Sequence, residues 1–198
     1  MTDQAISLVL ASASPRRREL LANMGCTFSV LNCEVDESRN HDESADDYVT
    51  RMSEEKARAG MGALNITGNS IVAVLAADTI VTQGQSVFGK PRNQQHAFRM
   101  WRQLANSKHH VITAVCLTVR DKVEVRRVTS TVEFGSIDDH QMLRYWQTGE
   151  PRDKAGGYAI QGRASAWIKL IHGSYSNVVG LPLRETNELL QSVGHNWL

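Results

Sequence analysis

Residues 6–18 read Ile-Ser-Leu-Val-Leu-Ala-Ser-Ala-Ser-Pro-Arg-Arg-Arg, and they contain the first strand and the first helix of the predicted fold. The apolar, partly β-branched run Ile6 to Ala11 indicates a buried strand. Ser14 followed by Pro15 is typical of a helix start, because serine caps a helix and proline fits its first turn. The N–H groups at a helix start can bind an anion, and the arginines at 16–18 add positive charge. The alternative is a basic turn exposed to water.

Strand-like and helix-like patterns alternate along the rest of the chain, which predicts the α/β class with a mixed sheet and flanking helices. Strands are expected at residues 6–11, 27–33, 70–81, 111–119, 123–134 and 167–171, with a hairpin at 80–88. Helices are expected at 15–24, 44–64, 93–104, 136–146 (opened by a capping box at 136–139) and from 182 onwards. No linker, repeat or low-complexity segment divides the chain, so residues 1–198 are predicted to form a single domain.

The composition is that of an ordinary globular protein, with 41% hydrophobic and 22% charged residues. The formal net charge of +1 gives no long-range attraction to nucleic acid or to an anionic membrane. No apolar stretch is as long as a membrane span, and residues 1–7 lack the pattern of a signal peptide. The three cysteines are never spaced as Cys-x-x-Cys, which argues against a disulfide framework. A cytoplasmic location is therefore expected, with no membrane and no stably bound nucleic acid as partner.

Lys56 lies within the apolar face of the expected helix at residues 44–64. The residues assigned to that face, at helical spacing, are Ala45, Tyr48, Val49, Met52, Ala59 and Ala63. Lysine rarely points into a core unless its charge is paired, so a carboxylate or a substrate phosphate is expected beside it. The alternative is a lysine whose amine reaches the edge of the apolar face.

Carboxylates occur at two places that suit a metal ion. Asp78 follows the apolar run 71–77 and is expected at the end of a buried strand, where ligands gather in α/β proteins. It could bind a metal or accept a proton from water, and the alternative is an aspartate that caps a turn. Glu34, Asp36 and Glu37 lie in a polar loop, and hard oxygen ligands of this kind suit Mg²⁺ or Mn²⁺. The alternative there is an acidic loop exposed to water.

Two segments with glycine could contact a nucleotide. Gly89-Lys90-Pro91 could present Lys90 to a phosphate, although the same tripeptide is also typical of an ordinary turn. Ile160-Gln161-Gly162 lies in the glycine-rich region 148–165, where Gln161 could contact the edge of a base or be an ordinary loop residue. Cationic groups, carboxylates and a glycine-rich loop together suit hydrolysis of a phosphate ester. The chain lacks the Gly-x-x-x-x-Gly-Lys-Ser/Thr motif, which argues against an ordinary kinase or GTPase.

Short blocks along nearly the whole chain resemble those of one protein family. They occur at residues 12–17, 34–37, 55–57, 77–79, 89–91, 153–156 and 180–182. In sequence and in order, they resemble the signature blocks of the Maf nucleotide pyrophosphatases, a family also called septum formation inhibitors. Each block alone is weak, but blocks that stay in register from about Leu8 to Leu190 are specific.

The resemblance implies a Maf/inosine-triphosphatase-like α/β fold, with two lobes around a cleft. It also implies hydrolysis of a nucleoside triphosphate to the monophosphate and pyrophosphate, with a divalent cation such as Mg²⁺, Mn²⁺ or Co²⁺. Asp78 would be the proton acceptor, and Glu37 and Asp78 would hold the metal. The residues that would contact the nucleotide are Ser12, Arg16, Arg17, Lys56, Thr79, Lys90 and Gln161.

The segments 77–79 and 160–162 resemble those of the subgroup that acts on dTTP and UTP, with a house-cleaning role on canonical or modified pyrimidine nucleotides. Arg16, Thr79 and Gln161 would be the substrate-discriminating positions. Residues 157–159, Gly-Tyr-Ala, depart from the family pattern, in which alanine precedes the tyrosine and glycine follows it.

Other functions stay open at this point. One is a regulatory or nucleic-acid-binding module linked to cell division, which would use the cluster Arg16 to Arg18; the net charge near zero argues against it. Another is a pyrophosphatase for purine nucleotides of the inosine triphosphate type. The sequence is compatible with a homodimer and does not fix the oligomeric state.

Overall fold

The computed structural model describes residues 6–66 and 70–195. Its strands are β1 (Ile6–Ala11), β2 (Ser29–Leu31), β3 (Ile71–Gln83), β4 (Ser86–Phe88), β5 (Lys108–Val119), β6 (Lys122–Phe134) and β7 (Ile168–His172). Its α-helices are α1 (Pro15–Asn23), α2 (Ala45–Gly62), α3 (Gln94–Leu104), α4 (Asp139–Gln147), α5 (Tyr175–Val179) and α6 (Leu183–Ser192). Short 3₁₀ helices are η1 (Glu150–Asp153), η2 (Ala155–Gly157) and η3 (Arg163–Trp167). The prediction that residues 1–7 lack a signal-peptide pattern falls mostly on residues 1–5, which lie outside the described ranges.

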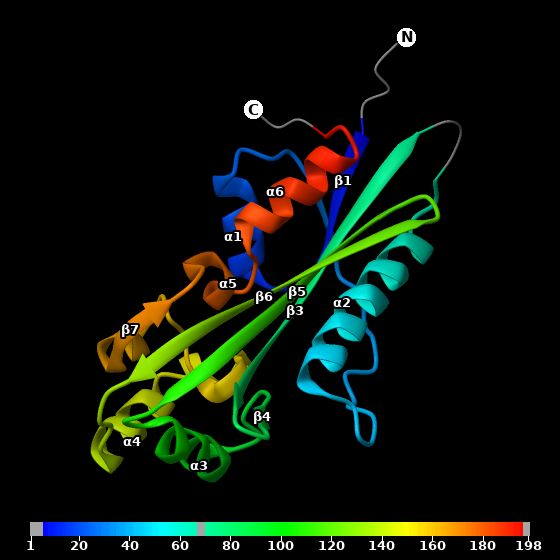
Figure 1. Cartoon of the computed structure of the whole chain (residues 1–198). Coiled ribbons are helices and arrows are strands. Elements are labelled where there is room, and N and C mark those ends of the chain that lie inside the picture. The colour runs from blue at the N-terminus through cyan, green and yellow to red at the C-terminus, as the bar shows by residue number, and fades with distance from the viewer. Residues whose placement is uncertain (1–5, 67–69, 196–198) are drawn as a thin grey trace. The chain divides into compact units, whose positions relative to one another are not determined.

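The strands form a mixed sheet in the order β2-β1-β3-β5-β6-β7, with β4 paired to β3. Strand β1 is parallel to both neighbours, with Val9 opposite Ser29 on one side and opposite Val74 on the other. Strands β4 and β7 are antiparallel to β3 and β6. The predicted α/β class, with a mixed sheet and flanking helices, is therefore confirmed (Figure 1). Among the described residues, no helix has the length and apolar character needed to cross a membrane.

The chain divides into two compact units. The first unit takes the described residues of 1–78, 113–128 and 180–198, and the second takes 79–112 and 129–179. Strands β3, β5 and β6 each contribute residues to both units. The single-domain organisation and the cleft stay predictions.

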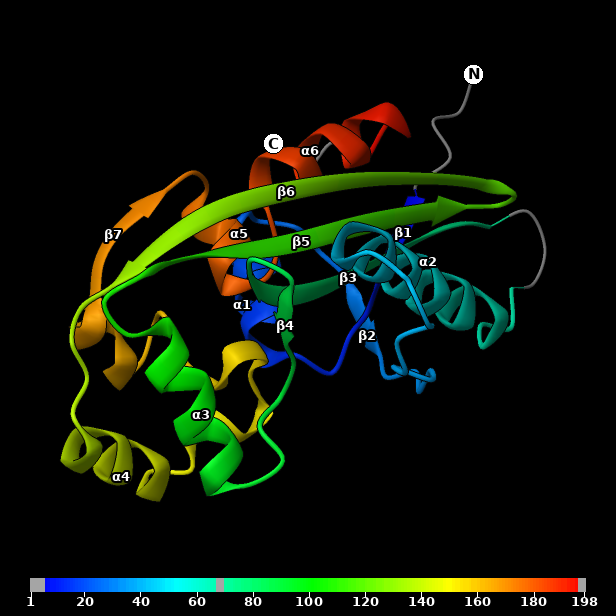
Figure 2. The ribbon, with the colours of Figure 1, turned by 60° about the horizontal axis from the view of Figure 1, so that its bottom comes forward.

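In the first unit, helices cover both faces of the strands. Helix α2 lies on one side of β1, whereas α1 and α6 lie on the other, and the second view agrees for α2 and α6 (Figures 1 and 2). Gly60 makes the close approach of α2 possible, because a Cβ atom at this position would lie 2.8 Å from Ala11 Cβ and 3.0 Å from Val74 Cγ1. A contact of 2.8 Å between carbon atoms is well inside their optimal separation of about 3.5–4.0 Å. Any side chain at position 60 would push the helix away from the sheet.

The buried face of α2 differs from the predicted one. Ala63 is exposed and Ala59 is half-buried, whereas Ser53, Ala57 and Gly60 are buried. Val49 and Met52 are buried as predicted, but Ala59 and Ala63 are not part of the buried face. That face follows residues 49, 53, 57 and 60, which recur about one helical turn apart. The N-terminus was predicted correctly, since Ser44 accepts a hydrogen bond from the Asp47 N–H.

The second unit is built around aromatic side chains. Trp101 on α3 is fully buried and lies 5.3 Å from the Tyr145 ring and 5.8 Å from the Trp167 ring, between centroids. Its indole N–H donates to the Gly157 carbonyl at 3.1 Å. Helices α3 and α4 lie side by side (Figure 2). The buried residues of α3 recur at helical spacing, and they are Ala97, Met100, Trp101 and Leu104.

Several predicted boundaries in the chain were wrong, among them the start of β5, which begins at Lys108 instead of residue 111. Strand β2 is only Ser29–Leu31, shorter than the predicted 27–33. The capping box that opens α4 joins Asp138 to Gln141, not Ser136 to Asp139. Helix α5 lies in a segment for which no helix was predicted, and it is too short to show a helical period.

The departure at residues 157–159 has a structural basis. Gly157 has φ +68°, a left-handed conformation that alanine adopts only with strain, and a Cβ there would lie 3.2 Å from Trp101 Nε1. Alanine before the tyrosine would therefore disturb the packing of Trp101. Ala159 is 5% exposed and fits its buried position.

His109 is buried beside Tyr158 in the same unit. Its Nε2 lies 2.7 Å from the Tyr158 hydroxyl, and the Phe134 ring packs edge-on against it at 4.8 Å. Its Nδ1 has no hydrogen-bond partner among the described residues. Burial lowers the pKa of His109 to about 4, and the charge of His110 acts in the same direction.

We expect the protein to lose stability as the pH falls from about 6.5 to about 4, because His109 is buried without a charge. In this window the unfolded chain binds a proton that the folded protein does not, so the free energy of unfolding falls with falling pH, by about 3 kcal/mol in total. His109→Gln keeps hydrogen-bonding groups but cannot titrate, so it should flatten the decline. Urea unfolding of both proteins across this window measures the effect. An equal decline in both proteins would contradict the assignment to His109.

Candidate active site

Lys56 joins two carboxylates in the first unit. Its ammonium nitrogen donates to Glu37 Oε1 at 2.8 Å and to Asp78 Oδ1 at 2.7 Å. The side chains of Lys56 and Asp78 are each 13% exposed, whereas that of Glu37 is 46% exposed. The prediction of a paired lysine is confirmed, and the alternative of a lysine at the edge of the apolar face is excluded.

Asp78 lies inside strand β3, not at its end as predicted. The strand continues to Gln83 because Val81, Thr82 and Gln83 pair with β4. Asp78 directly follows five buried residues, 73–77, in this strand. Its side chain is therefore mostly buried, and only its outer part reaches solvent. An aspartate that caps a turn is therefore excluded.

Two side chains of α2 hold the backbone of the loop that carries Glu37. The Tyr48 hydroxyl donates to the Glu37 carbonyl at 2.8 Å, and Arg51 Nη2 donates to the Ser38 carbonyl at 3.0 Å. Burial raises the pKa of Tyr48 to about 12, and the nearby charges of Asp78 and Glu37 act in the same direction, so Tyr48 stays a donor. The position of Glu37 is thus set from the helix that also carries Lys56.

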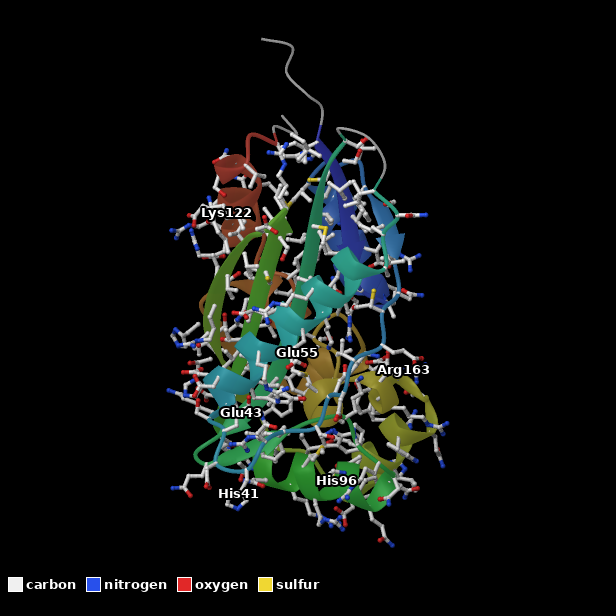
Figure 3. All side chains as sticks on the ribbon, turned by 90° about the vertical axis from the view of Figure 1, so that its right-hand side faces the viewer. His41, Glu43, Glu55, His96, Lys122 and Arg163 are labelled. Atoms are coloured by element: carbon white, nitrogen blue, oxygen red, sulfur yellow. The ribbon has the colours of Figure 1, made fainter. Side chains whose placement is uncertain are left out.

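Arg51 also fixes the far end of this loop. Its Nε and Nη2 donate to the two carboxylate oxygens of Glu43 at 2.6 and 2.8 Å, and its Nη1 donates to Glu55 at 3.2 Å. These hydrogen bonds lower the pKa of Glu43 to about 2. Glu43 lies beside the start of α2 and Glu55 further along it (Figure 3). In the sequence, the only indication of this arrangement is the helical spacing of Tyr48, Arg51 and Glu55. An ordinary exposed helix face shows the same spacing, so the role of these residues in holding the loop was not predicted.

Asp36 takes part in the loop's own turn. Its Oδ1 accepts a hydrogen bond from the Ser38 N–H at 2.9 Å, and its pKa is lowered first by the Ser38 side chain and then by this N–H. This contact assigns Asp36 to the local backbone, and Lys56 contacts Glu37 instead. Of the three carboxylates predicted in this loop, the structure brings Glu37 to Asp78.

Arg17 connects the start of α1 with a distant segment of the same unit. Its Nε donates to the Gly180 carbonyl at 2.8 Å, and its Nη1 lies 3.4 Å from Ser12 Oγ. Burial lowers the pKa of Arg17, and the charges of Asp78 and Glu37 oppose this shift. The guanidinium therefore lies within electrostatic range of both carboxylates.

The start of α1 differs from the expected capping arrangement, and its role as an anion site stays a prediction. Ser14 occupies the capping position, but its side chain makes no capping hydrogen bond. Its N–H instead donates to Ser12 Oγ at 3.2 Å. Besides burial, the like charge of Arg16 lowers the pKa of Arg17, so the two positive charges repel each other. An anion between them would relieve this repulsion.

The remaining predicted residues lie in the second unit. Thr79 follows Asp78 in β3, and Lys90 is exposed in the turn after β4. That turn is tied to η2, because the Gly156 N–H donates to the Gly89 carbonyl at 3.1 Å. Gln161 is exposed in the loop between η2 and η3. The position of these three residues relative to Ser12, Arg17, Glu37, Lys56 and Asp78 stays a prediction.

The carboxylates of Glu37 and Asp78 fit a divalent cation that is bound jointly by the protein and the phosphates of a substrate. Among the described residues, no group of three or more His, Cys, Asp or Glu side chains could hold a metal by itself. Mg²⁺, however, is usually held by one or two carboxylates together with substrate phosphates. Glu37 and Asp78 converge on a single cation, the Lys56 ammonium, so their oxygens suit such a shared site.

The mixed sheet and this cluster define an α/β protein whose first unit combines carboxylates, a lysine and arginines at one place. A family model described as Maf-like protein matches residues 7–193. The chain belongs to this family.

Relatives named dTTP/UTP pyrophosphatase are similar to this chain over nearly its full length. That of Hahella chejuensis is 44% identical over 187 residues, which cover 94% of this chain and 92% of the relative. Those of Pseudoalteromonas atlantica and Yersinia pestis are 47% and 46% identical, over 92% and 93% of this chain and 95% and 91% of the relatives. Among solved structures, that of the Staphylococcus aureus Ham1 protein is similar with 13% sequence identity and a TM-score of 0.44. The match covers 94% of this chain and 97% of the Ham1 chain. We base no conclusion about fold or function on this similarity.

Proposed function

We propose that the protein hydrolyses dTTP and UTP to the monophosphate and pyrophosphate. The observation that carries the proposal is the contact of Lys56 with both Glu37 and Asp78, close to Arg17. Relatives 44–47% identical over nearly all of the chain carry the name dTTP/UTP pyrophosphatase, which supports the same substrates here. A cytoplasmic house-cleaning role, with small-molecule nucleotides as partners, is part of the proposal.

The carboxylates carry the chemistry of the attacking water. Asp78 is proposed as the proton acceptor, which orients the water and takes its proton. Glu37 and Asp78 would hold a divalent cation, Mg²⁺, Mn²⁺ or Co²⁺. When bound, such a cation neutralises phosphate oxygens. Lys56 lies between the two carboxylates, where it keeps them directed at one point and can contact a phosphate oxygen.

The cationic groups of α1 bind the phosphates. Arg17 is held by the Gly180 carbonyl and Ser12, so its guanidinium is placed before a substrate arrives. Groups positioned in this way stabilise the negative charge that develops on the pyrophosphate leaving group. Arg16 adds a second guanidinium at the same helix start, where free N–H groups favour an anion. In the second unit, Lys90 is proposed to contact phosphate, and Thr79 and Gln161 to discriminate among bases.

A nucleotide panel tests the proposal. The protein is incubated with dTTP, UTP, dCTP, GTP, ITP and ATP in Mg²⁺, Mn²⁺ or Co²⁺, and pyrophosphate and orthophosphate are measured separately. We expect pyrophosphate and a monophosphate as first products, with dTTP and UTP used fastest. First products of diphosphate and orthophosphate would refute a pyrophosphatase, and a preference for GTP or ITP would favour the purine alternative. The Asp78→Asn variant, purified in parallel, excludes activity from a contaminant.

A further inference from the structure

The loop that presents Gln161 lies between two buried anchor points. Ala159 and Ile160 are 5% and 8% exposed, and Ala164 after the loop is fully buried. Gln161 itself is exposed. A short exposed segment between buried residues keeps one conformation only if its backbone is held by contacts from outside the loop.

Tyr145 and Glu150 provide these contacts. The Tyr145 hydroxyl donates to Glu150 Oε1 at 2.8 Å and accepts from the Ala159 N–H at 3.1 Å. The second carboxylate oxygen, Glu150 Oε2, accepts from the Arg163 N–H at 3.3 Å. The phenol and the carboxylate therefore bind the residues two positions before and two positions after Gln161.

Gly162 shows how closely the carboxylate lies against the loop. A Cβ atom at this position would be 2.0 Å from Glu150 Oε1 and 2.4 Å from its Cδ. The φ of Gly162 is −112°, which any residue can adopt, so a side chain at 162 would meet no backbone strain but would have to displace the Glu150 carboxylate. The absence of a side chain at 162 is thus part of the same arrangement.

Packing holds Tyr145 in place. Its ring is 4% exposed and lies 5.3 Å from the Trp101 ring and 4.8 Å from the Trp167 ring, between centroids. The hydroxyl therefore has a fixed position from which it orients the Glu150 carboxylate. A rigid aromatic core is in this way connected to the backbone on both sides of Gln161.

We propose that Tyr145 and Glu150 are positioning residues that set the nucleotide selectivity of this protein, by fixing the loop from which Gln161 reads the base. The inference rests on the proposed function for the identity of the substrates. The loop geometry itself depends only on contacts within the second unit.

The first test compares selectivity in Glu150→Gln and Tyr145→Phe. Both changes keep the size of the side chain, and phenylalanine keeps the ring packing against the tryptophans. We expect the ratio of kcat/KM for dTTP to that for GTP to fall about tenfold, the effect of one lost hydrogen bond, with kcat/KM for GTP little changed. The matched control is Asp139→Asn, an exposed carboxylate on α4 that pairs with Arg102; it should leave the ratio unchanged. An unchanged ratio in both test variants would overturn the proposal.

A double-mutant cycle tests whether Glu150 acts through Gln161. Gln161→Ala alone should lower the same ratio, and adding Glu150→Gln to it should lower the ratio no further, because residues that act through one contact are not additive. A full additional loss in the double variant would show that Glu150 does not act through Gln161, and would contradict the proposal.

Hydrogen exchange separates this proposal from the proposed function. Peptides covering 159–163 should exchange faster in Glu150→Gln and Tyr145→Phe, at a melting temperature close to that of the wild type. If the wild-type protein prefers purine nucleotides, the proposed function is wrong. Even then, the positioning role is supported if Glu150→Gln and Tyr145→Phe lose the purine preference and exchange faster at residues 159–163. Unchanged exchange together with an unchanged preference would overturn the positioning role alone.

Discussion

Replacing Asp78 with asparagine should lower the turnover of dTTP by about a hundredfold or more, because acid–base catalysis alone contributes about 10²–10⁴-fold. Asparagine keeps an oxygen that can accept the hydrogen bond now made by Lys56 at 2.7 Å, but it removes the charge and the proton-accepting site. Lys56 also keeps its contact with Glu37, so no ammonium is left unpaired. The melting temperature should therefore stay close to that of the wild type, and binding of the nucleotide should suffer less than turnover.

Asp36→Asn is the matched control for this change. Its carboxylate lies in the nearby acidic loop but accepts a hydrogen bond from the Ser38 N–H. We expect it to keep most of the activity. Turnover and melting temperature should be measured on one purified sample of each variant. If Asp78→Asn retained more than about a tenth of wild-type turnover, Asp78 would not be a general base of this kind.

Replacing Lys56 with methionine should lower turnover by about a hundredfold, since it removes a charge-assisted contact at a site where negative charge develops. Methionine keeps most of the apolar stem of lysine, so the packing of α2 should survive. The change leaves the Glu37 and Asp78 carboxylates facing each other without the ammonium that now joins them. Like charges placed together destabilise the protein and attract a divalent cation more strongly.

In Lys56→Met, catalytic turnover should therefore fall while the affinity for a divalent cation rises. The dissociation constant for Mn²⁺, measured by electron paramagnetic resonance without nucleotide, should fall in Lys56→Met, and Mn²⁺ should restore its melting temperature. Arg58→Met is the control, because Arg58 is an exposed cation on the same helix that pairs with Glu54. It should change neither quantity. A melting temperature that Mn²⁺ does not restore, together with normal turnover, would make Lys56 a structural residue.

Local patterns in the sequence were sufficient for some parts of this protein. The buried face of α3 and the caps at Ser44 and Asn93 follow from helical spacing and from side chains within three residues of the groups they contact. The chemistry of the cluster could also be predicted, since a lysine in an apolar face needs a partner.

Other parts depended on contacts between distant residues. Asp78 was predicted at the end of its strand because the apolar run 71–77 stops there. The hairpin at 80–88 was predicted correctly, but the apolar run does not show that β3 continues through Asp78 into this hairpin. The choice of Glu37 over Asp36 depends on α2, whose Tyr48 and Arg51 hold a loop without any periodic pattern. The contacts of Glu150 with the Gln161 loop join residues 13 positions apart through an irregular segment.

The small separation between α2 and the sheet at Gly60 has a consequence for how the protein can evolve. Lys56 is one helical turn before Gly60 on the same helix, so the depth at which the helix sits also sets the reach of the ammonium toward Asp78. A single methyl group at position 60 would act as a spacer beneath the helix and lift the lysine away from its carboxylates. Selection for catalysis should therefore act on Gly60, although this residue has no side chain and no contact with the substrate. A larger residue at position 60 should be tolerated only together with a smaller residue at position 11 or 74, which lie opposite it.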